Sequence, residues 1–144
     1  MSYSVDVNVL LCASDRASPH HAGAVRFLEA RTTDPELCCL AWPVLMAYVR
    51  IATHPRVFAH PLSPADALGN IQALLDLHRV RVLSEADGFL DVYRNVTTGL
   101  SSRGNLVPDA HLAAILRQHD VRTLYTTDAD FRKFPFLDVQ NPLA

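Results

Sequence analysis

Short apolar segments alternate with amphipathic segments along the whole chain, and this alternation constrains the fold more than any other feature. Four apolar runs, at residues 3–7, 37–42, 80–83 and 121–125, have the length and composition of strands. They are too apolar to face water on either side, which is typical of parallel strands covered by helices. We therefore predict an α/β fold, a three-layer sandwich in which a central parallel sheet of four to five short strands has helices on both faces.

Capping residues and prolines mark the starts of the predicted helices. Ser18 and Ser63 each precede a proline, which combines an N-cap with proline at the first helical position. Pro43 and Pro108 open two more helices, and Ser84 is expected to cap another. The predicted helices cover residues 8–12, 19–31, 43–51, 64–78, 85–99 and 108–116, followed by a helical turn at 128–134.

The length and organisation of the chain indicate one core. The sequence has 144 residues and contains no repeat, low-complexity tract or linker, so we predict a single domain over residues 1–144. It has no basic stretch followed by a long apolar run, and no segment stays apolar for the roughly 20 residues that a bilayer crossing needs. We therefore expect a cytoplasmic protein without membrane contact.

The charge balance limits how this chain would meet a nucleic acid. The formal net charge is −2, whereas general nucleic-acid binders carry a strong excess of Lys and Arg. Lys133 is the only lysine, so phosphate contacts would be local and made by arginine. The charge alone neither establishes nor excludes RNA as a ligand.

The cysteines and histidines do not form a metal or disulfide framework. The cysteine count is three, and Cys38 and Cys39 are adjacent on a predicted strand, where their side chains point to opposite faces. We expect buried thiols in a reducing compartment. None of the seven histidines makes the spaced pair of a zinc site, and His111 is expected to be structural.

Three aspartates are expected at the same end of the predicted sheet. Asp6 ends the first strand, Asp109 opens a helix, and Asp128 follows the last predicted strand. Ligands of such folds bind at the carboxyl ends of the strands, where these residues would meet. Converging carboxylates raise one another's pKa values, and a hard divalent cation stabilises them. We predict that Asp6 and Asp109 hold Mg²⁺, with Mn²⁺ as a substitute, and that Asp128 completes the catalytic site.

Each of these residues also has a purely structural interpretation. Asp109 would complement the dipole of its helix, and Asp128 would cap the turn that follows it. Asn8 would either orient a water on the metal or cap the first helix. Asp130 is expected to point elsewhere on its turn, and Trp42 is expected to lie in the core rather than to stack on a base.

Four segments in order resemble the PIN-domain ribonucleases of the VapC toxin type. They read V-D-V-N-V-L-L at residues 5–11, M-A-Y-V-R-I-A-T-H-P-R-V-F at 46–58, G-N-L-V-P-D-A-H-L-A-A at 104–114 and L-Y-T-T-D-A-D-F-R-K-F at 124–134. The closing N-P-L at residues 141–143 is similar to the ends of many mycobacterial toxins. The resemblance implies a PIN-like sandwich, Mg²⁺-dependent endoribonuclease activity on RNA, a homodimer, and a cognate VapB-like antitoxin as partner.

The resemblance assigns the family's acids to particular residues of this chain. The first falls on Asp6, the helix-borne acid on Asp109, and the acid after the last active-site strand on Asp128. The family's glutamate, three residues before Arg50, is replaced by Ala47, which leaves open whether one or two ions bind. Glu85, near the end of another predicted strand, is a candidate to replace that glutamate.

The predicted function is hydrolysis of an RNA phosphodiester in which a cation held by Asp6 and Asp109 activates the attacking water. Arg50 or Arg103 would contact flanking phosphates. A haloacid-dehalogenase-like phosphatase is one alternative, because Asp6-Val7-Asn8 resembles a D-x-D motif. The other is a PIN-fold module that binds RNA or an antitoxin with weakened or lost catalysis.

Overall fold

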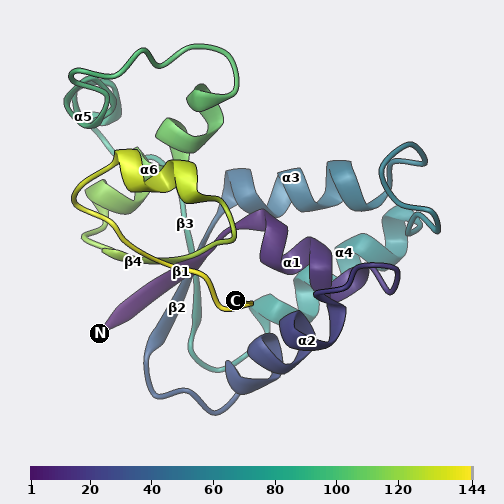
Figure 1. The fold of residues 1–144 in the computed structure, drawn as a ribbon. Helices are drawn as coiled ribbons and strands as arrows, with labels where there is room; N and C mark the ends of the chain where they lie inside the picture. The colour runs from purple at the N-terminus through teal and green to yellow at the C-terminus, as the bar shows by residue number, and fades with distance from the viewer. Residues whose placement is uncertain (144) are drawn as a thin grey trace.

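Five parallel strands form a single central sheet in the computed structural model, which describes residues 1–143. The sheet has the strand order β3-β2-β1-β4-β5, and every neighbouring pair is parallel (Figure 1). The strands are β1 (Ser2–Val5), β2 (Leu37–Ala41), β3 (Val80–Leu83), β4 (Thr123–Tyr125) and β5 (Asp138–Gln140).

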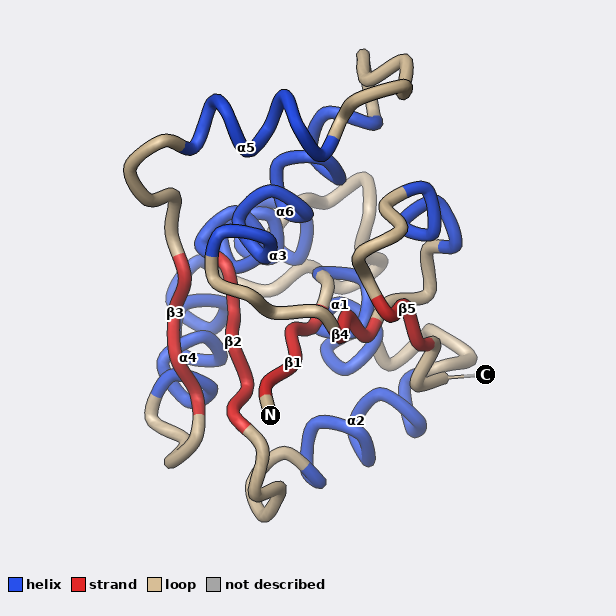
Figure 2. The backbone as a smooth tube through the Cα atoms, turned by 90° about the vertical axis from the view of Figure 1, so that its left-hand side faces the viewer, coloured by secondary structure: helices blue, strands red, loops and turns tan. Residues whose placement is uncertain are grey.

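Helices cover both faces of this sheet, which confirms the predicted three-layer α/β sandwich (Figures 1 and 2). The elements α1 to α4 lie on one side, and α5 and α6 lie on the other. The helices are α1 (Val7–Ser14), α2 (His21–Ala30), α3 (Trp42–Ala52), α4 (Pro64–Leu75), α5 (Phe89–Val96) and α6 (Leu106–Gln118), with a short 3-10 helix η1 (Ala129–Lys133).

The strand order reverses between β1 and β4, and this reversal creates the place where a ligand would bind. From β1 the chain crosses first to β2 and β3 on one side, and later to β4 and β5 on the other. Pairing of β1 with β4 continues past the strands, because the Asp6 N–H donates to the Tyr125 carbonyl over 2.9 Å. In open parallel sheets, ligands bind in the crevice at such a switch point, outside the carboxyl ends of the strands.

Small side chains let α6 pack closely on the sheet. Its buried residues are Ala110, Leu112, Ala113, Ala114, Ile115 and Leu116, and all are at most 3% exposed. Three alanines on that face keep the helix near the apolar residues of the central strands, such as Leu124 and Leu40, which are also buried. The start of α6 is thereby fixed beside the carboxyl ends of the strands.

Two helices begin later than predicted, each for a local reason. The Ser18 hydroxyl accepts from the His20 N–H in a local turn, so α2 begins only at His21. The predicted cap at Ser84 is also wrong: the chain passes through Gly88, whose φ of 78° is left-handed, and α5 starts at Phe89. By contrast, the Ser63 hydroxyl caps α4 as predicted, accepting from the Asp66 N–H.

The apolar residues of α3 differ in burial from one side of the helix to the other. Leu45 and Tyr48 are buried, so this side of α3 packs inside the protein. Trp42 is 43% exposed, and the expectation that it lies in the core is therefore wrong. Within residues 1–143, no helix has both the length and the apolar character that a membrane crossing requires.

Candidate metal centre

Asp6 stands where β1 gives way to α1, and the backbone fixes its side chain at the switch point. It is the N-cap of α1, and its Oδ1 accepts from the Val7 N–H over 2.8 Å. Its Oδ2 accepts from the Thr126 hydroxyl over 2.8 Å, and the residue is only 8% exposed. Each carboxylate oxygen accepts one hydrogen bond, so both oxygens keep a lone pair for a further ligand.

Thr126 connects the ends of β1 and β4 at this point. Besides donating to Asp6, its hydroxyl oxygen accepts from the Asp128 N–H over 3.0 Å and from the Asn8 side-chain amide over 3.3 Å. The side chain is 1% exposed, so these bonds lie in a region from which water is largely excluded. Thr126 therefore sets the relative positions of Asp6, Asn8 and Asp128.

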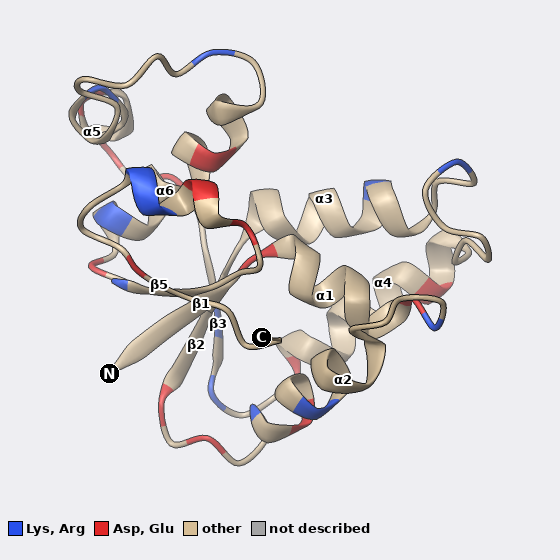
Figure 3. Cartoon of the chain, viewed as in Figure 1, with Lys and Arg blue, Asp and Glu red and all other residues tan. Residues whose placement is uncertain are grey.

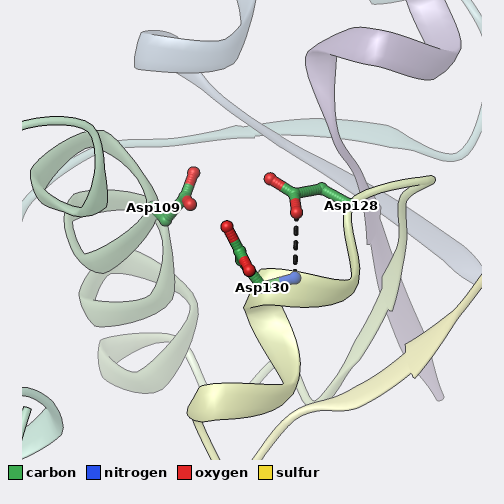
Figure 4. Close-up of side chains that lie close together, drawn as sticks. All are labelled: Asp109, Asp128 and Asp130. Carbon is green, nitrogen blue, oxygen red and sulfur yellow. Dashed lines mark hydrogen bonds between the residues drawn. The ribbon is translucent and has the colours of Figure 1, made fainter.

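Three further carboxylates meet beside Asp6. Asp109 in the first turn of α6 faces Asp128 and Asp130 at the start of η1 (Figure 4). One oxygen from each residue lies within 4.8 Å of those of the other two. Asp128 caps η1 through a 2.9 Å bond from the Asp130 N–H to its Oδ1. Figure 3 shows the acidic residues gathered beside α6, near the start of α1.

Buried aromatic residues hold the short helix η1 in place. Phe131 and Phe134 are 1% and 0% exposed, and their ring centres lie 6.3 Å apart. A five-residue 3-10 helix has little stability of its own, so this anchoring is what keeps Asp128 and Asp130 facing α6.

Burial and mutual repulsion perturb the acids of this site. Burial, together with the charges of Asp128, Asp6 and Asp130, raises the pKa of Asp109 to about 6, against a smaller opposing effect of Lys133. Burial also raises the pKa of Asp6, which is lowered in part by the bonds from Thr126 and Val7. Without a cation, the site thus favours protonated carboxyl groups.

The geometry suits a hard divalent cation with oxygen ligands. Bonds of about 2.1 Å around Mg²⁺ place neighbouring ligand oxygens roughly 3 Å apart and opposite ones roughly 4 Å apart. The oxygens of Asp109, Asp128 and Asp130 span up to 4.8 Å, so small side-chain rotations would bring them onto one ion. An ion there would replace the repulsion between carboxylates with attraction.

The structure brings together two of the three predicted site residues directly and sets the third beside them. Asp109 and Asp128 share the acidic cluster, while Asp6 lies close enough for its charge to raise the pKa of Asp109. Asp130 belongs to the same cluster, so the expectation that it points elsewhere is wrong. In the sequence, the position of Asp130 two residues after the capping Asp128 was the signal that could have placed it in the cluster.

Asn8 neither caps the first helix nor lies free. Asp6 caps α1, while the Asn8 amide donates to Thr126 and its Oδ1 accepts from the Thr127 N–H over 3.4 Å. The linking role of Thr126 depends on the adjacency of β1 and β4, which a single sequence does not reveal.

Comparison with known proteins places the chain in a family. The model of the PIN domain matches residues 3–137. Ribonuclease VapC48 of Mycobacterium tuberculosis is 43% identical over 144 residues, which covers 100% of this chain and 99% of the relative. The chain belongs to the VapC ribonucleases of the PIN domain family. Ribonuclease VapC37 of the same organism is 32% identical over 130 residues, 90% of each chain.

Solved VapC structures share the fold. The Mycobacterium tuberculosis toxin VapC20, described as cleaving the sarcin-ricin loop, aligns with a TM-score of 0.70 at 20% identity, covering 96% of this chain and 98% of that one. VapBC2 from Rickettsia felis, bound to a promoter DNA fragment, also gives a TM-score of 0.70, at 16% identity and 98% coverage of both chains.

The VapC family's glutamate has no direct replacement on α3. Ala47 stands at that position, and Glu85 pairs with His111, whose hydrogen bond lowers the pKa of the Glu85 carboxyl. The Phe89 ring packs edge-on to His111, with 5.5 Å between ring centres, in line with the expected structural role of this histidine. Asp130 instead adds a carboxylate to this PIN domain's cluster from the η1 side.

The raised pKa of Asp109 predicts an unusual dependence of stability on pH in the metal-free protein. The folded-state pKa of about 6 exceeds the ordinary value of about 3.9, so the folded state keeps a proton that the unfolded chain releases. The free energy of unfolding should therefore fall as pH rises from 4 to 6 and then level off. Asp109→Asn should be more stable than wild type above pH 6 by about 1 kcal/mol, after allowance for solvent screening.

Urea unfolding in EDTA between pH 4 and 8 measures this difference. Asp87→Asn is the matched control, since Asp87 is exposed and its side chain makes no hydrogen bond or ion pair to residues 1–143. The stability of the control should follow that of wild type. An Asp109→Asn variant that is less stable than wild type at pH 7.5 would show that the carboxylates do not repel one another.

Proposed function

We propose that this protein is a divalent-metal-dependent endoribonuclease and the toxin of a toxin–antitoxin pair. The observation that carries the proposal is the convergence of Asp109, Asp128 and Asp130 beside the buried Asp6 in a VapC-family fold. Relatives at 43% and 32% identity are named ribonucleases, and VapC20 is described as a toxin that cleaves the sarcin-ricin loop. We propose Mg²⁺ as the ion, with Mn²⁺ able to replace it.

The proposed roles follow from the free lone pairs of each carboxylate. Asp109 and Asp128 would hold the ion, with Asp130 and Asp6 completing its surroundings directly or through water. When bound, the cation supplies Lewis acidity and offsets the negative charge of the phosphodiester. The second oxygen of Asp128, not engaged with the Asp130 N–H, is available to orient the attacking water. Thr126 holds Asp6 and Asp128 in register and acts as a positioning residue.

The phosphatase alternative finds little support in these contacts. A phosphoryl-transfer site of that type needs a second acid two residues after Asp6, and Asn8 there is bonded to Thr126 and Thr127. It also needs a free lysine, and Lys133 lies 3.8 Å from Asp130 in an ion pair.

Removing one carboxylate tests the proposed chemistry. Asp109→Asn and Asp6→Asn should each lower Mg²⁺-dependent RNA cleavage by more than about 100-fold, beyond what is typical of groups that only orient ligands. Cleavage of a labelled RNA, followed with Mg²⁺ and with EDTA, is the measurement. Asp87→Asn should cleave like wild type. Equal activity of all four proteins, or full activity in EDTA, would rule the proposal out.

A metal titration separates the nuclease from a module that only binds. Mn²⁺ should raise the melting temperature of wild type, since an ion that binds only the folded state stabilises it, and Asp109→Asn should lose most of this shift. If Mn²⁺ shifts neither protein although RNA binds, the binding module is the better description.

We also propose that an antitoxin occupies an apolar groove on the side of the sheet that carries α1 to α4. The groove has a volume of about 550 Å³ and is lined between α1, α2 and α4 by Leu10, Ala13, Val25, Leu28, Leu74 and Leu77, among others. At its wall the Tyr48 hydroxyl bonds with Ser14 (2.6 Å) and accepts from Asn70 (2.9 Å). The structure of VapBC2 from Rickettsia felis contains such a partner pair, which supports an antitoxin as occupant. An amphipathic segment fits a groove of this composition.

A charge placed in the groove should block this partner without unfolding the toxin. Ala73→Glu adds a carboxylate at an exposed groove position of α4, while the control Leu68→Glu adds one at an exposed position of the same helix outside the groove. Co-purification with the antitoxin encoded beside the toxin should be lost for Ala73→Glu alone, at unchanged RNA cleavage. Equal binding by both variants would place the antitoxin elsewhere.

A further inference from the structure

A small pocket adjoins the acidic cluster on the side of β5. It has a volume of about 60 Å³, which is room for a few water-sized groups. Asp128 forms part of its wall and belongs to the cluster as well, so the two sites share a residue. The rest of its lining is Thr126, Thr127, Ala129, Arg132, Val139 and Asn141.

The polar groups of this pocket are uncommitted donors. Arg132 forms no ion pair with any residue that the structure describes, whereas its neighbour Lys133 pairs with Asp130. The Asn141 Oδ1 accepts from the Leu143 N–H over 2.9 Å, which leaves the amide N–H groups free to donate. The Thr127 hydroxyl has no hydrogen bond within residues 1–143. A guanidinium, an amide and a hydroxyl around one small space suit an oxyanion.

The position of the pocket limits which oxyanion it would take. An anion there would lie directly beside the carboxylates that would hold the catalytic ion. Because that ion would bind Asp128, the Asp128 carboxylate would not repel the anion. The substrate of the proposed reaction carries a phosphate on each side of the scissile one. A chain with a net charge of −2 has no broad positive field to draw RNA in, so a local arginine contact matters more.

We propose that Arg132, together with Thr127 and Asn141, binds the RNA phosphate adjacent to the scissile one and so sets which linkage reaches the acidic cluster. This inference rests on the proposed ribonuclease function. It replaces the sequence-based suggestion of Arg50 or Arg103, neither of which lines the pocket that contains Asp128. Arg132 is a binding residue in this account, and its loss affects substrate binding more than the chemical step.

Kinetics of Arg132→Gln provide the first test. KM for RNA should rise about 10-fold with kcat changed less than about 3-fold, since the contact is a charge-assisted bond present before and during the reaction. With Mg²⁺ present and the Asp6→Asn substitution slowing cleavage, the added loss of Arg132 should take about 0.7 from the log–log slope of the salt dependence of RNA binding, the value for one contact to a single strand. The matched control is Arg122→Gln, at an exposed arginine just before β4, at the amino ends of the strands and thus at the end of the sheet opposite to the acidic cluster. It should change neither value.

A substrate with one neutral linkage identifies the phosphate. After the cleavage site is mapped, each flanking phosphate is replaced in turn by an uncharged methylphosphonate. At one adjacent position, neutralisation should raise KM about 10-fold for wild type and for Arg122→Gln, yet leave Arg132→Gln unchanged, because its contact is already gone. If every neutral linkage affects all three proteins equally, or if Arg132→Gln lowers kcat at unchanged KM, the proposal is wrong.

The two proposals fail in different ways. Absence of metal-dependent cleavage by wild type would contradict the ribonuclease function, and the slopes of RNA binding against salt, measured with Mg²⁺, would then still report whether Arg132 contacts a phosphate. Normal cleavage with an unaltered Arg132→Gln variant would contradict only the phosphate site.

Discussion

Repulsion between carboxylates that the fold forces together is the constraint around which this protein is organised. Asp6 is fixed by the end of β1, Asp109 by the packing of α6, and Asp128 and Asp130 by the anchored helix η1. Each backbone position is determined by apolar packing elsewhere, so the acids cannot separate to relieve their charge. Among residues 1–143 the nearest offset is the exposed ion pair of Lys133, which is worth little in water. A bound divalent cation is the remaining way to lower the energy of this site near neutral pH.

The surroundings of the cluster explain how a weakly charged chain would still handle RNA. A hydrogen-bond hub at Thr126 keeps the acids in register, and the pocket at Arg132 places one positive charge beside them. The apolar groove between α1, α2 and α4 contains none of the four clustered acids, so the proposed partner surface and the proposed catalytic site are separate. A partner bound in this groove would not need to contact the proposed catalytic residues.

The sequence predicts most of the fold because apolar pattern and capping are local. The strands β1 to β4 and the start of α4 follow from runs and caps that the chain itself carries. The edge strand β5 escaped prediction, since its three residues alternate between exposed and half-buried positions and gain their structure only from β4. The start of α5 depends on the left-handed turn at Gly88, which competes with the capping serine at residue 84.

The candidate site was predictable only in part for the same reason. Residues that follow strands, such as Asp6 and Asp128, can be placed by topology alone. The orientation of Asp130 depends on how Phe131 and Phe134 anchor η1, and the role of Thr126 depends on the neighbouring strand. Such contacts between distant segments cannot be deduced from the apolar periodicity of a single sequence.

The most direct test of the central claim is a crystal structure with Mn²⁺ near pH 7.5, in which anomalous scattering locates the ion. The account predicts a peak about 2.1 Å from oxygens of both Asp109 and Asp128, within reach of Asp6 directly or through one water. A peak elsewhere, or an empty cluster at saturating Mn²⁺, would contradict it.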